Sequence, residues 1–327
     1  MIDYLVSVLT IGAIGCIIAL GLNVRWGWAG DFDLSYYAFV ATGAYLGGVM
    51  VLGRAPGVLD ETWILGLNQN FVIGLIVAIV GSIAVSAVIG AIALRRVRSD
   101  YFAIVTLAFA LIAVAFVSQQ NALFNGSNGL FGIPQPLADS IDPTTYSYLF
   151  FGLCLAFLAA TYLVLEWIFR SPFGRTLRTI REDEVAAAAF GKNVIAFKLK
   201  AFMIGGAIAG AGGFLFATYL TAWSPGTWSP FEAILLYTAI FLGGQGNSRG
   251  VIVGVLVALV ALPEATRFLP VIPNHPNLYP ELHNFVQMLL LLAILRWRPQ
   301  GLIPEPLFTD LLARRSEGKP ESVGSHG

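Results

Sequence analysis

"FVIGLIVAIVGSIAVSAVIGAIAL", residues 71–94, contains no charged residue and is long enough to cross the hydrocarbon core of a bilayer as a helix. Similar runs recur along a chain of 327 residues, of which 57% are hydrophobic and 12% are charged. This composition leaves almost no polar face, which argues against a soluble protein. The runs also lack the alternation of apolar and polar residues that a membrane β-barrel requires. We therefore predict an all-α polytopic membrane protein.

The apolar runs predict about eight to ten transmembrane helices, some of them short or broken. Two consecutive runs, 231–243 and 250–263, are short. They form either a tilted pair or a hairpin that enters and leaves on the same side. The predicted segments, each within a few residues, are 4–23, 34–53, 71–94, 101–118, 147–169, 199–220, 231–243, 250–263 and 283–297.

The distribution of Lys and Arg predicts the orientation of these segments. When the segments alternate in direction, every basic residue except Arg54 and Arg267 falls on one side of the membrane. Basic residues are enriched in cytoplasmic loops, so this side is predicted to be cytoplasmic, with the N-terminus outside and the C-terminus inside. The transmembrane domain then covers residues 1–302, with a large cytoplasmic loop at about 170–198. Residues 303–327 are predicted to form a polar cytoplasmic tail.

The stretch "RTIREDEVAAAAFGKN", residues 178–193, is a charged segment within this large loop. Acidic residues before an alanine run favour a short helix, and Gly191 is a suitable residue to end it. A charged, exposed helix between two membrane spans is a natural docking element for a partner. The alternative is a solvated loop helix with no partner.

The sequence carries no motif for nucleotide hydrolysis, for metal binding or for nucleic-acid binding. The only Gly-Lys pair in the loop, within "AAAAFGKN", lacks the leading Gly and the following Ser or Thr of a phosphate loop. The three histidines have no Cys or carboxylate at metal-ligand spacing. We expect a chain without an ATPase site, metal or cofactor, driven by partner subunits or by an ion gradient.

Glycines predict where the helices approach one another closely. Small residues spaced four apart allow close helix contact in lipid. The stretch "GGAIAGAGG", residues 205–213, is the richest and predicts a tight interface within this subunit or with another one. The predicted packing positions are Gly206, Gly210, Gly213, Gly250 and Gly254.

Ionisable residues at the ends of apolar runs are candidates for a transport path. In "RWGWAGDFDLSYYAF", residues 25–39, glycines and two aspartates precede a span, which favours a broken helix. Glu232 starts a short apolar segment, where a charge is unfavourable unless it faces water or a partner. The aspartates could instead be rim residues, and Glu232 could reach the headgroups beside anchoring tryptophans, Trp223 and Trp228. The candidate pathway residues are Gly27, Gly30, Asp31, Asp33, Ser35 and Glu232.

Several motifs resemble the permease subunits of branched-chain amino acid ABC importers, the LivM-type family. They are "RVRSDYFAIVTLAFALI", "NGSNGLFGIP", "SPFGRTLRTIREDEVAAAAFGKNVIAFKLKAF", "SPGTWSPFEAILL", "FLGGQGNSRGVIVG" and "RPQGLI". They occur in the family's order from about residue 20 to 303. The resemblance is specific because the motifs share this order.

The resemblance implies an importer subunit of the bacterial inner membrane. Its loop would insert a coupling helix into a cleft on the ATP-hydrolysing subunit. Its partners would be two cytoplasmic ATP-binding subunits, a second permease and an extracytoplasmic solute-binding protein. The implied coupling residues are Arg178, Arg181, Glu182, Asp183, Glu184, Ala187 and Gly191.

The resemblance favours branched-chain amino acids as substrates, with other amino acids, urea-like amides, small carboxylates or aromatic acids as alternatives. Family members typically have Gln, Ser, Gly and His where this chain has Asp31, Asp33, Ser35 and Tyr36. An ion-gradient-driven secondary transporter would fit the hydropathy equally well, but would normally show paired internal repeats.

Overall fold

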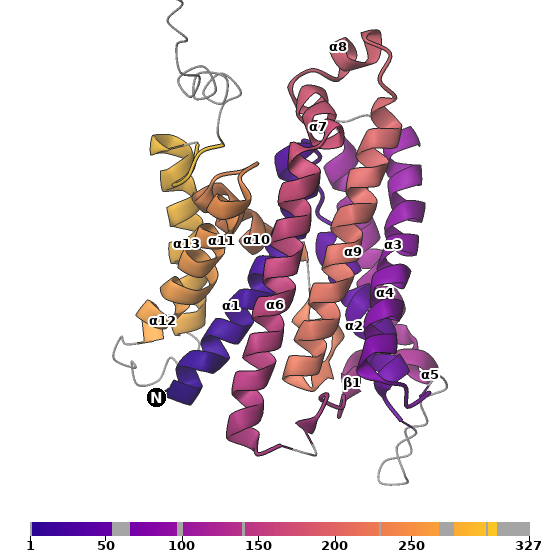
Figure 1. The fold of residues 1–327 in the computed structure, drawn as a ribbon, viewed down its shortest axis with the longest axis vertical. Helices are drawn as coiled ribbons and strands as arrows, with labels where there is room; N and C mark the ends of the chain where they lie inside the picture. Colours follow the sequence, from indigo (N-terminus) through magenta and orange to yellow (C-terminus); the bar gives the residue numbers. More distant parts are fainter. Residues whose placement is uncertain are drawn as a thin grey trace, which may run out of the picture.

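The computed structural model describes residues 2–53, 66–96, 101–138, 141–228, 230–267, 278–298 and 300–305. Over these ranges the chain is a bundle of helices with one short antiparallel strand pair, β1 (Leu130–Phe131) with β2 (Ala222–Trp223). Most of the long helices run roughly along one axis, and α1 is inclined to them (Figure 1). The prediction of an all-α polytopic membrane protein is confirmed.

The helices follow the predicted apolar segments closely. The first half comprises α1 (Ile2–Asn23), the π-helical turn η1 (Val24–Trp28), α2 (Tyr36–Val51), α3 (Phe71–Arg96), α4 (Phe102–Gln119), α5 (Asn121–Phe124), the 3-10 turn η3 (Gly126–Asn128) and α6 (Pro143–Arg170). The second half comprises α7 (Pro172–Glu182), α8 (Glu184–Ala189), α9 (Val194–Leu220), the 3-10 turn η5 (Pro225–Thr227), α10 (Pro230–Gly243), α11 (Ser248–Val255), the π-helical turn η6 (Leu256–Ala261), α12 (Leu262–Arg267) and α13 (Leu278–Trp297).

Within the described residues, 6 helical segments are long and apolar enough to cross a membrane. One of them is Ser248–Ala265, which joins α11, η6 and part of α12 and is longer than the predicted segment 250–263. The α2 helix and residues Phe285–Ile294 of α13 are shorter apolar helices, as is the 14-residue α10. The short and broken segments that the sequence suggested are therefore present.

The α9 helix packs tightly against α2 and α3 through its glycines. A Cβ atom added to Gly213 would lie 1.9 Å from the carbonyl oxygen of Val40 in α2. One added to Gly210 would lie 2.4 Å from Ser82 Oγ in α3. Because lipid offers no hydrophobic drive for helix association, such close backbone contacts supply the dispersion that holds the helices together. The tight interface of residues 205–213 therefore lies within this subunit.

The helices α10 and α11 meet in the same way. A Cβ atom on Gly254 would lie 2.0 Å from the carbonyl oxygen of Ala239, and one on Gly250 would lie 2.5 Å from that of Gly243. Any side chain at these two positions would push the helix pair apart. A Cβ atom added to Gly206 of α9 would lie 2.4 Å from Ser86 Oγ in α3.

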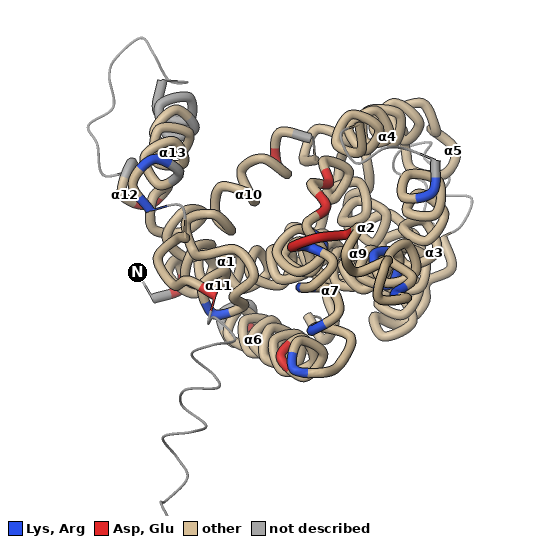
Figure 2. The backbone as a smooth tube through the Cα atoms, turned by 90° about the horizontal axis from the view of Figure 1, so that it is seen from above, with Lys and Arg blue, Asp and Glu red and all other residues tan. Residues whose placement is uncertain are grey.

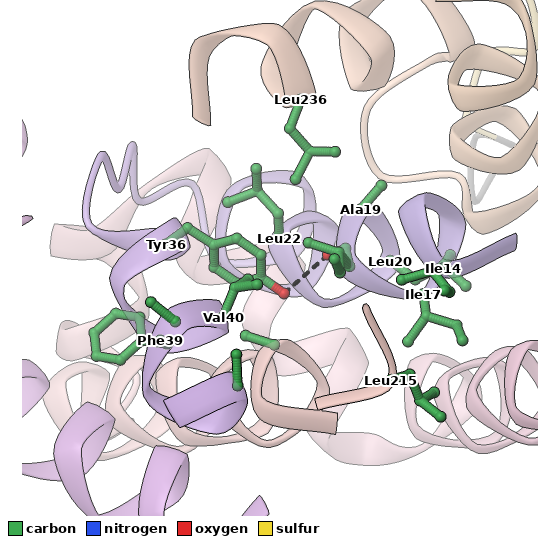
Figure 3. Packing of buried hydrophobic residues seen from close by; sticks show 14 of the residues in the cluster. Ile14, Ile17, Ala19, Leu20, Leu22, Tyr36, Phe39, Val40, Leu215 and Leu236 are labelled. Atoms are coloured by element: carbon green, nitrogen blue, oxygen red, sulfur yellow. Dashed lines mark hydrogen bonds between the residues drawn. The ribbon is translucent and has the colours of Figure 1, made fainter. Parts of the chain in front are cut away.

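Buried aromatic side chains complete the core. The Tyr36 hydroxyl at the start of α2 points toward α1 and donates a hydrogen bond of 2.9 Å to the Ile18 carbonyl oxygen (Figure 3). Trp223 and Trp228 are buried inside the protein, with 0% and 2% of their surfaces exposed. Their burial does not fit the alternative in which these two tryptophans anchor the protein in the lipid headgroups.

Both α7 and α8 lie at one end of the bundle, and the N-terminus lies at the opposite end together with β1 and α5 (Figure 1). Residues 303–305, assigned to the tail by the sequence, pack at the α7 end, where the Ile303 amide donates to the Gly243 carbonyl oxygen at 2.9 Å. The remainder of the predicted tail, 306–327, and Arg54 lie outside the described residues.

Candidate coupling and transport site

The charged stretch 178–193 forms the end of α7 and the whole of α8. The two helices are separate because Asp183 has extended backbone angles, φ −155° and ψ 106°. The Asp183 carboxylate caps α8 by accepting hydrogen bonds of 2.9 Å from the amides of Val185 and Ala186. Gly191 follows α8 with φ +76°, the left-handed conformation that suits a helix end. The predicted helix is present, but it begins at Glu184 and Glu182 belongs to α7.

The outer side of this helix pair is exposed and partly apolar. Val185 and Phe190 have 80% and 82% of their surfaces exposed, although both are hydrophobic. On the inner side, Leu177, Ile180 and Ala187 are buried. These two side chains give the charged, protruding helix pair an exposed apolar surface. The predicted contact set lacked Val185 and Phe190, because their exposure depends on how the helix pair is oriented.

Lys198, near the start of α9, joins the inner side of α8 to the connection between α1 and α2. Its Nζ atom lies 2.6 Å from Asp31 Oδ1 and also forms an ion pair with Glu184. The Lys198 and Asp31 side chains are 7% and 8% exposed. Burial raises the pKa of the Asp31 carboxyl to about 6, and the Lys198 ammonium partly offsets this rise. The structure thus brings together Glu184 and Asp31, which the sequence assigned to two different sites.

Arg181 of α7 forms a second link to the same region. Its guanidinium donates to the Gly27 carbonyl oxygen in η1 and, at 2.7 Å, to Glu305 Oε2 in the C-terminal segment. The nearby Gly30 has φ +81°, and a Cβ there would lie 3.1 Å from the Arg181 side chain. The predicted break after α1 is therefore a π-helical turn followed by an irregular stretch that α7 covers.

Asp33 and Ser35 form part of a fully buried cluster. Asp33 pairs with Arg25, and both side chains are 0% exposed. The Arg25 guanidinium also lies over the Phe202 ring, 3.7 Å from its centroid. Asp33 accepts a 2.8 Å hydrogen bond from the Ser35 amide, and its own amide donates to the Tyr237 hydroxyl at 2.8 Å. Asp33 and Ser35 therefore contact other groups of the protein itself. That they line a transport path stays a prediction.

Glu232 is separate from these clusters. It lies in the first turn of α10 and is half-buried. Seen from above, most of the backbone belongs to uncharged residues, and Lys, Arg, Asp and Glu occupy few positions (Figure 2). Within the part of the chain that the structure describes, no group of three or more His, Cys, Asp or Glu residues could hold a metal ion.

A bundle of apolar, glycine-packed spans with a charged, protruding helix pair at one end has the architecture of a multi-pass membrane permease. The chain belongs to the family described as the permease component of branched-chain amino acid transport systems, whose model matches residues 4–295. Members of this family are transport subunits and not enzymes. The LivM-type resemblance and the function as an ABC importer permease subunit are confirmed.

Individual relatives agree with this assignment. The chain is 30% identical over 323 residues to the high-affinity branched-chain amino acid transport system permease protein LivM of Escherichia coli, covering 91% of this chain and 70% of that protein. It is 29% identical to a probable LivM permease of Methanocaldococcus jannaschii, covering 91% and 93%. It is 25% identical to the permease LivH of Escherichia coli, covering 91% and 93%. No solved structure matches.

Proposed function

We propose that this chain carries branched-chain amino acids across the bacterial inner membrane as one of two different permease subunits of an ATP-driven importer. Two of its relatives in Escherichia coli, LivM and LivH, are each named as a permease protein of a high-affinity branched-chain amino acid transport system, which supports pairing with a LivH-like subunit. Two cytoplasmic ATP-binding subunits supply the energy, and an extracytoplasmic solute-binding protein delivers the substrate. The permease itself holds no ATPase site and no cofactor.

The family match supports the substrate class, and the link from α8 through Lys198 to Asp31 is the structural observation that supports coupling to partner subunits. Val185 and Phe190 face outward, where a partner subunit can contact them, while Glu184 is tied inward. A partner that moves α8 therefore also pulls on the start of α9 and on the connection between α1 and α2. Such a bridge converts the closure of the ATP-binding subunits into a change in the path between the two permeases.

The same geometry supports a cytoplasmic position for α7 and α8. Arg175, Arg178 and Arg181 all lie on α7, at the end of the bundle opposite the N-terminus (Figure 1). Because basic residues concentrate on the cytoplasmic side, we place the N-terminus outside and the residue 300–305 segment inside.

Purification of the complex from its native membrane tests the proposal. The chain, tagged and gently extracted, should copurify with two ATP-binding subunits and a second permease. In proteoliposomes with ATP inside and the binding protein outside, the complex should accumulate labelled leucine, and unlabelled isoleucine and valine should compete. Uptake driven by an ion gradient without ATP would replace this proposal with a secondary transporter. ATP-driven uptake with competition only by urea or small carboxylates would overturn the substrate.

A further inference from the structure

The C-terminal segment 300–305 is bound to the turn between α10 and α11. The Leu302 amide donates to the Leu242 carbonyl oxygen at 2.8 Å, and the Ile303 amide donates to that of Gly243 at 2.9 Å. The Asn247 side-chain amide donates to the Ile303 carbonyl oxygen at 3.3 Å. This segment lies beyond residues 4–295, which the family model matches.

Glycines allow the two backbones to approach this closely. Gly244 and Gly301 have φ angles of +118° and +75°, and a Cβ on Gly244 would lie 2.3 Å from the Ile303 carbonyl oxygen. The motifs "FLGGQGNSRG" and "RPQGLI" therefore pack against each other. Their packing places Glu305 beside α7.

The Glu305 carboxylate faces two arginines of α7. Its Oε2 atom lies 2.7 Å from Arg181 Nη2, and its Oε1 atom lies 3.9 Å from Arg178 Nη1. The three side chains are only 17% to 20% exposed, so water screens these charges weakly. Arg181 at the same time donates to the Gly27 carbonyl oxygen. Glu305 thus holds Arg181 at a junction of α7, η1 and the turn that follows α10.

We propose that Glu305 is a positioning residue of the α7–α8 loop, which keeps Arg181 on η1, the turn that follows α1, so that movement of α7 and α8 reaches the membrane helices. The inference rests on the proposed function. A charge-assisted hydrogen bond of this kind is stronger than a neutral one, and without it two like-charged arginines would face each other. Because both arginines lie on α7, their repulsion would turn the Arg181 side chain away from the Gly27 carbonyl oxygen of η1 while leaving the membrane helices packed.

The test compares Glu305→Gln with Glu166→Gln in the complete transporter in proteoliposomes. Glu166 is a matched control because it accepts a 2.7 Å hydrogen bond from Arg170 on the exposed surface of α6. We expect Glu305→Gln to lower the leucine transported per ATP hydrolysed by about tenfold, the factor that about 1.4 kcal/mol of lost coupling produces. Glu305→Asp should recover part of the ratio, and Glu166→Gln should match the wild type.

The ratio of transport to hydrolysis separates positioning from a merely structural role, which would lower the amount of folded complex and leave the ratio unchanged. If Glu305→Gln fails to fold, the double variant Glu305→Gln with Arg178→Gln removes the excess charge and is measured instead. A wild-type ratio in the folded variant overturns the inference alone. A wild-type complex without ATP-driven uptake overturns the proposed function, and the inference with it.

Discussion

Replacement of Lys198 by Met tests the bridge between α8 and the connection that follows α1. The substitution keeps the length of the side chain and removes its charge. Asp31 is then left buried without its cation, whereas Glu184, with 46% of its side chain exposed, can turn to water. Breaking a buried ion pair by removing one partner lowers the free energy of unfolding by about 3 to 5 kcal/mol. We expect a loss of this size at about pH 8.

The loss should shrink as the pH falls, because Asp31 can then take up a proton. In the wild type, burial raises the pKa of Asp31 to about 6, and Lys198 works against this rise. Without Lys198 the pKa of Asp31 in the folded variant is higher still, while in the unfolded chain it is about 3.9. Between the two folded-state pKa values the folded variant binds a proton that the folded wild type does not.

Over that window the variant regains about 1.4 kcal/mol for each pH unit, or up to about 2.7 kcal/mol between pH 8 and pH 6. Below about pH 6 the carboxyl is protonated in both folded proteins, so the difference between them stays constant. Protonation of Asp31 contributes its full stability to both folded proteins below the unfolded-state pKa of this carboxyl. Each protein loses that contribution as the pH rises through its own folded-state pKa of Asp31.

Equilibrium unfolding in mixed detergent micelles, at several pH values, measures these differences. Lys200→Met is the matched control, since Lys200 lies on the same helix with an exposed side chain, 5.9 Å from the Phe197 ring centroid. The double variant Lys198→Met with Asp31→Asn should recover most of the stability at pH 8. If the double variant is no more stable than Lys198→Met alone, or if the loss does not change with pH, the buried bridge is not what stabilises this region.

Three further predictions concern transport and packing. Reversing the charges of Glu184 and Arg181 should abolish ATP-driven uptake while the protein still reaches the membrane, as uptake assays and membrane blots would show; unchanged uptake contradicts the coupling role. Gly213→Val should reduce the folded protein recovered in detergent severalfold, because a Cβ there lies 1.9 Å from a carbonyl oxygen of α2; Gly152→Ala, with nothing within 4 Å, is the control. Glu232→Gln should lower the maximal uptake rate at least tenfold if Glu232 lines the path, and an unaltered rate in folded protein would place it at the rim.

The class of the protein follows from local properties of its sequence. The length and hydropathy of a run such as 71–94 decide that it crosses the membrane. The run is long enough to span the hydrocarbon core, and a helix satisfies its own backbone hydrogen bonds without any distant part of the chain. The break after α1 and the helix at Glu184 follow from neighbouring residues in the same way, as Gly27, Gly30 and Asp183 show. Ordered motifs along the chain were likewise enough to identify the permease family.

Only the tertiary structure decided which charged groups meet. Lys198 and Asp31 are 167 positions apart, and Arg181 and Glu305 are 124 positions apart. Every basic residue on the predicted cytoplasmic side satisfies the same orientation rule, so the sequence cannot tell an exposed lysine such as Lys200 from the buried Lys198. A burial of this kind depends on how α9 packs against α2 and α3 through its glycines, which brings the start of α9 beneath α8. For the same reason Asp31 and Asp33, only two positions apart in the sequence, form ion pairs with different basic side chains in the folded protein: Asp31 with Lys198 and Asp33 with Arg25.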